Sequence, residues 1–116
     1  MDINEFGGYL PLEVPNDKKE FYRTNKSFKV LDLNSGRSAF YFAVKSGNIK
    51  KIFLPYFACP KTEDPFIKNG VKIEYYFLND DLTPKDIKIQ NNDYLLWTNY
   101  FGNATDSEIK KVVNNY

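Results

Sequence analysis

The short apolar run Ile52-Phe53-Leu54-Pro55 constrains the fold of this chain more than any other segment. It is too short for a helix, and an uninterrupted apolar run of this length is typical of a strand that is buried on both faces. Pro55 ends the run, because proline lacks the N–H group that a central strand donates to its neighbours. Two further runs, at residues 71–77 and 94–98, predict additional strands of the same sheet.

Helical segments separate these strands. We predict helices over Ser35 to Lys45, Thr62 to Asn69 and Ser107 to Asn114, with Pro60 in the first turn of the second. Gly47-Asn48 and Gly70 are typical helix stops. The residues expected to face inward are Ala39, Phe40, Phe42, Ala43 and Val44 in the first helix, and Ile109, Val112 and Val113 in the last. The resulting order predicts an α/β fold with a mainly parallel sheet and flanking helices.

Length and composition limit the possible functions. The 116 residues suit a single α/β unit spanning 1–116, in which residues 1–27, with Gly7-Gly8, Pro11 and Pro15, form an irregular arm. A net charge of +1 gives no reason to expect nucleic acid or a membrane surface as partner. One cysteine and no histidine exclude a disulfide framework, a Cys-rich zinc site and His-based triads. We therefore expect a cytoplasmic protein without a metal site.

The ends of the predicted strands and the start of the first helix are the candidate ligand sites. Ser35 can cap a helix whose first N–H groups lack internal partners and can hold an anion; Gly36 allows close approach, and Ser38 adds a hydroxyl. From these residues alone, a helix start with nothing bound is the favoured interpretation. Right-handed crossovers would bring this start to the same sheet edge as Tyr56–Cys59 and Asn99–Gly102.

Two other features have structural interpretations that we favour. Cys59 is expected to be a small buried side chain, with an exposed reactive thiol as the alternative. Asp80-Asp81 is expected to lie in a solvated turn, because no nearby residue completes a metal-ligand set.

Four segments in this order resemble the DegT/DnrJ/EryC1/StrS family of sugar aminotransferases. The family's Ser-Gly-Thr-Ala-Ala-Leu turn is similar to Leu33-Asn34-Ser35-Gly36-Arg37-Ser38-Ala39-Phe40. The family's strand and loop that end in Pro-Ser-Phe-Thr-Phe are similar to the run from Ile52 to Cys59. Residues 70–80 resemble the family's Gly-Ala-x-Pro-Val-Phe-Val-Asp run. A later strand end of the family resembles Trp97-Thr98-Asn99-Tyr100-Phe101-Gly102. The resemblance covers about Asn34 to Gly102.

The resemblance implies the N-terminal part of an aspartate-aminotransferase-like large domain, which is fold type I of the pyridoxal-phosphate (PLP) enzymes. Family members transfer an amino group between an amino donor and a keto-sugar nucleotide, and their sites form between two subunits, which implies a homodimer. When the family's phosphate contacts are carried over to this chain, they fall on Gly36, Arg37 and Ser38. In family members, an aromatic side chain from the loop after the second strand stacks on the pyridine ring of the cofactor. Direct alignment places Cys59 at the position of that aromatic side chain. Phe57, two residues earlier, has the ring that stacking requires, so the choice between Cys59 and Phe57 stays open.

The chain also departs from the family pattern. Arg37 replaces a threonine, and Asn99 replaces the usual histidine. None of the lysines lies in the motif that binds PLP covalently, so we expect the chain alone to be inactive and assign no catalytic or substrate-binding residue. The alternatives are a non-catalytic module that binds phosphate or a nucleotide-sugar, and an interaction domain without a ligand.

Overall fold

A computed structural model of the chain describes residues 29–116, and the predicted arm of residues 1–27 lies outside them. The chain divides into the units Met1–Asp32 and Leu33–Tyr116. All helices and strands described below belong to the second unit. The order is α1 (Gly36–Gly47), β1 (Lys51–Pro55), the 3₁₀ turn η2 (Pro60–Thr62), α2 (Asp64–Lys68), β2 (Lys72–Tyr76), β3 (Tyr94–Leu95), η3 (Tyr100–Gly102) and α3 (Asp106–Asn115).

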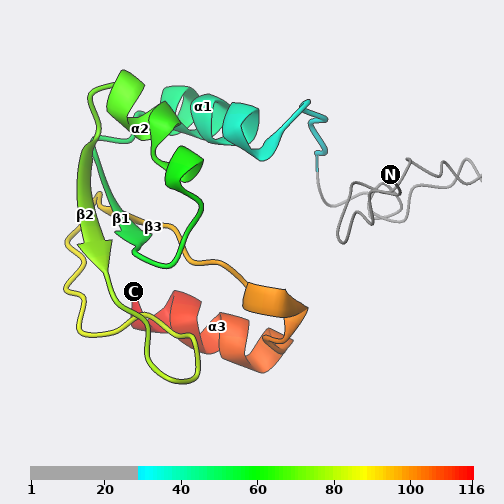
Figure 1. Cartoon of the computed structure of the whole chain (residues 1–116), viewed down its shortest axis with the longest axis vertical. Helices are drawn as coiled ribbons and strands as arrows, with labels where there is room; N and C mark the ends of the chain where they lie inside the picture. Colours follow the sequence, from blue (N-terminus) through cyan, green and yellow to red (C-terminus); the bar gives the residue numbers. More distant parts are fainter. Residues whose placement is uncertain (1–28) are drawn as a thin grey trace, which may run out of the picture. The chain divides into compact units, whose positions relative to one another are not determined.

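The three strands form one parallel sheet in the order β2-β1-β3 (Figure 1). In β1, Ile52 pairs with Ile73 of β2 and with Tyr94 of β3. Because the strands are parallel, their carboxyl ends lie at the same edge of the sheet. The structure therefore confirms the predicted α/β class with a parallel sheet and flanking helices.

The core lies between β1, β2 and the helices α1 and α2. Figure 1 shows these two helices side by side, and their Phe40 and Phe66 rings lie 5.6 Å apart between centroids. The buried cluster consists of Val44, Ile49, Ile52, Leu54, Phe66 and Val71, with Phe40, Ile73 and Leu96 packed against it. Burial of β1 from Ile52 to Pro55 confirms the interpretation of this apolar run as an internal strand.

Ion pairs and an aromatic ring cover the opposite face of the sheet, where alternation places Lys51 and Phe53. The Lys51 ammonium lies 3.1 Å from Asp93, 3.4 Å from Glu74 and 4.5 Å from the centroid of the Phe53 ring. Glu74 also pairs with Lys72 at 2.8 Å. This network holds β1, β2 and the residue that precedes β3 together.

The strand β3 is shorter than the predicted segment 94–98, and Pro55 explains why. The Leu96 N–H donates to the Phe53 carbonyl at 2.9 Å, as a parallel ladder requires. The next bond of that ladder would run from the nitrogen of residue 55 to the Leu96 carbonyl, but proline has no N–H. The Tyr76 hydroxyl donates to this carbonyl instead, at 2.7 Å. The chain then leaves the sheet.

Several predicted helix details need correction. The second predicted helix is divided into η2 and the short α2, although Pro60 does lie in its first turn. In α1, Ala39, Phe42 and Ala43 are exposed, because only the Phe40–Val44 side faces α2 and the sheet. Val113 of α3 is 69% exposed rather than inward, whereas Val112 is buried.

Candidate functional site

The first turn of α1 has the conformation predicted for Ser35. Its backbone is extended, and its Oγ accepts a hydrogen bond from the Ser38 N–H at 3.2 Å. The Ser38 hydroxyl donates to Asn34 Oδ1 at 2.6 Å. Asn48 ends the helix in a left-handed conformation, as predicted. Capping therefore uses the N–H and the hydroxyl of Ser38, and the N–H groups of Gly36 and Arg37 remain the natural anion donors of this helix.

The surroundings of Gly36 suit an anion. A Cβ at this position would meet no heavy atom within 4 Å, so the approach to the backbone is open. The first turn carries no acidic residue. The exposed Arg37 guanidinium adds a positive charge to that of the helix dipole.

An apolar cavity of about 560 Å³ lies where β1 and β3 end. Its lining comes from α1, from the loop after β1 and from the segment after β3, and comprises Phe40, Phe57, Ala58, Cys59, Thr62, Leu96, Thr98, Tyr100 and Phe101. The structure thus brings the predicted Phe57 and Cys59 together, with the predicted strand-end turn 99–102 beside them. Gly36, Arg37 and Ser38 do not line it. They begin the helical turn that leads to Phe40, about 6 Å along the axis from Gly36.

Tyr100 fixes the position of Phe57 across 43 residues of sequence. Their rings stack with centroids 5.3 Å apart and an interplanar angle of 25°, and the Tyr100 hydroxyl donates to the Phe57 carbonyl at 2.6 Å. Burial raises the pKa of Tyr100, and a hydrogen bond with Thr98 lowers it by less, so the hydroxyl stays protonated at neutral pH. Tyr56, by contrast, stacks on Tyr75 of β2 at 5.0 Å.

Cys59 is exposed, which contradicts the expected small buried side chain. The cause is local: Cys59 lies in the loop between β1 and η2, where its backbone is extended and its carbonyl accepts the Thr62 N–H at 2.8 Å. Only Pro65 and Phe66 of the helical segment that follows are buried. The thiol is therefore part of the cavity lining and not of the core.

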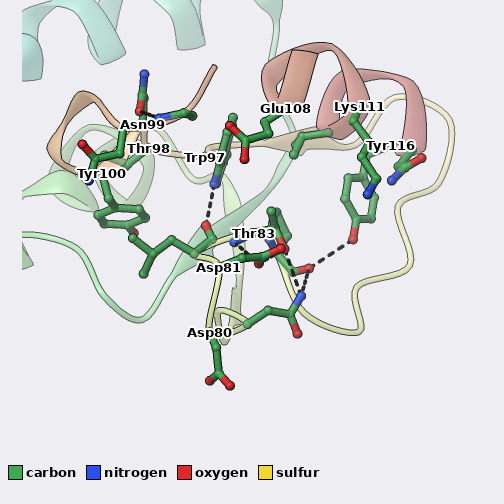
Figure 2. A pocket seen from close by; sticks show the side chains of 17 residues that line it. Asp80, Asp81, Thr83, Trp97, Thr98, Asn99, Tyr100, Glu108, Lys111 and Tyr116 are labelled. Carbon is green, nitrogen blue, oxygen red and sulfur yellow. Dashed lines mark hydrogen bonds between the residues drawn. The ribbon is translucent and has the colours of Figure 1, made fainter. Parts of the chain in front are cut away.

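A second cavity of about 610 Å³ lies between the loop after β2 and α3 (Figure 2), and we call it the polar cavity because most of the residues that line it are polar. The Trp97 indole N–H donates to the Leu82 carbonyl at 2.8 Å and so fixes the indole beside the loop. Tyr116 donates to the Pro84 carbonyl at 3.4 Å from the end of α3. Thr98 and Tyr100 line both cavities, so the segment after β3 separates the polar space from the apolar one.

Most polar groups around the second cavity stabilise local structure. Asp81 Oδ1 accepts from the N–H and hydroxyl of Thr83 at 3.0 and 2.5 Å, and these bonds lower the pKa of Asp81. Asn99 accepts the Ala104 N–H at 2.9 Å through Oδ1. Asp80 and Asp81 are exposed, which confirms the solvated turn. Within residues 29–116, no group of three or more Cys, Asp or Glu residues could hold a metal ion.

Several residues that line the apolar cavity were not assigned individually as site residues from the sequence: Phe40, Thr62, Leu96, Thr98, Tyr100 and Phe101. The signal for the last two was present, because the turn 99–102 was expected at the same sheet edge. Phe40 was interpreted only as a core residue, and Leu96 only as part of a strand.

No family model, curated protein or solved structure matches the chain. The resemblance to the sugar aminotransferases therefore stays a prediction. Among the residues that the structure describes, no helix is both long and apolar enough to cross a membrane.

Proposed function

We propose that the chain binds pyridoxal phosphate as the N-terminal part of a sugar aminotransferase large domain. The observation that carries the proposal is the apolar cavity at the carboxyl ends of β1 and β3, one helical turn from the start of α1. Open α/β sheets bind ligands at this edge. The α1 start would hold the phosphate, and the cavity would hold the ring.

The residues present fit this group. Gly36 and Arg37 supply N–H groups and a positive charge, and the space at Gly36 admits a phosphate oxygen. Phe57 supplies an aromatic face that Tyr100 already holds in place, so Phe57 rather than Cys59 is the proposed stacking partner. PLP supplies amino-transfer chemistry when a lysine binds it. Since none of the lysines of this chain lies in the family motif, we expect reversible binding without turnover.

The test measures the dissociation constants of three probes: PLP, pyridoxine, which lacks the phosphate, and inorganic phosphate. Gly36→Ala places a methyl group where the phosphate would approach. Losing one hydrogen bond to a charged group costs about 1.5–3 kcal/mol, or roughly ten- to a hundredfold in affinity. We expect this loss for PLP and phosphate, with pyridoxine unaffected. Gly47→Ala, at the other end of α1, is the matched control, because its Cβ would meet Ile49 at 3.4 Å and touch neither site.

Other outcomes have definite meanings. Phosphate binding that depends on Gly36, without binding of pyridoxine, would favour a non-catalytic phosphate or nucleotide-sugar module. If PLP binds equally to the wild type and to Gly36→Ala, the phosphate assignment is wrong. An intact mass of the protein made from its native gene, after borohydride reduction with PLP, tests membership of the enzyme family: a heavier product with a specific adduct supports it, and a product of this length without one contradicts it.

A further inference from the structure

Phe101 combines three properties. Its side chain is 79% exposed, its backbone is left-handed with a φ of 59°, and it lines the apolar cavity. The turn around it is well held: the Gly102 N–H donates to the Asn99 carbonyl, and the Asn103 N–H to the Tyr100 carbonyl, both at 3.2 Å. The strained conformation is therefore imposed by the turn.

Stability does not explain a phenylalanine at this position. A positive φ is unfavourable for a bulky residue, and glycine or asparagine would adopt it at lower cost. A ring that is mostly in water recovers little free energy from burial. The position therefore combines a backbone penalty with little packing benefit.

The other non-glycine residues with positive φ in the described part of the chain differ from Phe101 in residue type or in burial. Three of them are of the types that tolerate this conformation, namely Asn48, Asp86 and Asn92. The fourth, Leu82, also carries a backbone penalty, but its side chain is half-buried and so gains packing, and its carbonyl accepts the Trp97 indole N–H. Phe101 is the exception, and strained residues of this kind cluster at ligand sites.

We propose that Phe101 is a ligand-contacting residue whose ring closes over a planar aromatic ring bound in the apolar cavity. Phe57 and Tyr100 form the fixed side, because stacking and the hydrogen bond hold them together. The exposed Phe101 ring is the part of the lining that can gain contact when a ligand arrives. The identity of that ring as a pyridine rests on the proposed function, whereas the cavity itself does not depend on it.

The experiment replaces Phe101 in the full chain and measures thermal unfolding and ring binding. Phe101→Asn removes the ring and keeps a residue that tolerates the left-handed conformation, and Phe101→Tyr restores an aromatic ring. Phe77→Asn is the matched control, because Phe77 is 67% exposed and lines neither cavity. The probes are PLP, pyridoxine and indole, each titrated by NMR.

We expect Phe101→Asn to weaken binding of pyridoxine and PLP by about two- to tenfold, the range of one aromatic contact, without lowering Tm. Phe101→Tyr should bind as the wild type does, and Phe77→Asn should leave the affinity unchanged. If indole binds in a manner that depends on Phe101 while PLP and pyridoxine do not bind, the inference stands and the proposed function fails. The inference is overturned if affinity is unchanged in Phe101→Asn, if Phe77→Asn weakens binding equally, if Phe101→Asn lowers Tm, or if no ring binds the wild type.

Discussion

Replacing Tyr76 by phenylalanine tests how the sheet compensates for Pro55. The Tyr76 hydroxyl donates to the Leu96 carbonyl at 2.7 Å, and the residue is 2% exposed. Removing the hydroxyl deletes one hydrogen bond, worth about 0.5–1.5 kcal/mol, and leaves a carbonyl without its donor, which costs about 1–3 kcal/mol. We expect a loss of roughly 2 kcal/mol, or about 8–16 °C in Tm for a domain of this size class.

The assay is urea unfolding of the wild type, Tyr76→Phe and a control, Tyr94→Phe. Tyr94 donates its hydroxyl to the Gly47 carbonyl at 3.2 Å from an exposed position, so its loss should cost well under 1 kcal/mol. Hydrogen exchange of the Leu96 amide should speed up in Tyr76→Phe, since that amide bonds to Phe53 in the same short ladder. If the two variants lose equal stability, the assigned role of the Tyr76 hydroxyl is refuted.

Two further perturbations address the ion network and the last helix. Burial alone would raise the pKa of Asp93, but hydrogen bonds from the Gln90 N–H and from Lys51 outweigh it and lower the pKa below its usual 3.8. A carboxylate with a lowered pKa stabilises the fold above its unfolded pKa and loses this effect as pH falls through its folded pKa. We therefore expect Lys51→Met to have a lower free energy of unfolding in urea than the wild type at pH 7. A difference in this free energy that persists unchanged below about pH 3.8 would contradict this. Thr105→Ala removes the acceptor of the Glu108 N–H in the capping box of α3 and should cost about 1 kcal/mol in thermal unfolding, whereas Thr105→Ser should be nearly neutral.

Local signals made the ends of α1 and α3 predictable. Ser35 before an apolar run, and Gly47-Asn48 after it, placed α1 to within two residues. Thr105 caps α3, and the predicted helix from Ser107 to Asn114 differs from α3 by one residue at each end. In each case one short segment contains both the cap and the groups that it satisfies, so no distant contact is needed to decide the boundary.

Exposure and cavities depended on contacts that no single segment contains. Cys59 and Val113 are of residue types common in cores, but Cys59 lies in the loop between β1 and η2, and α3 buries Val112 rather than Val113. The polar cavity needs the loop after β2 to meet α3, and the Phe57–Tyr100 pair joins residues 43 positions apart. The sheet edge was predictable from topology, but the side chains that close a cavity there were not.

Pro55 links the shape of the sheet to the position of the apolar cavity. Because it cannot donate to the Leu96 carbonyl, the ladder between β1 and β3 ends one pair earlier than the apolar sequence would allow. The two strands are then free to diverge, and residues that follow them, 57–59 after β1 and Thr98, Tyr100 and Phe101 after β3, line the space between them. The Tyr76 hydroxyl donates to the Leu96 carbonyl, at the point where the ladder between β1 and β3 ends. A missing backbone donor in the central strand thus opens the sheet at the edge where a ligand would enter, and a side chain from the neighbouring strand limits how far it opens.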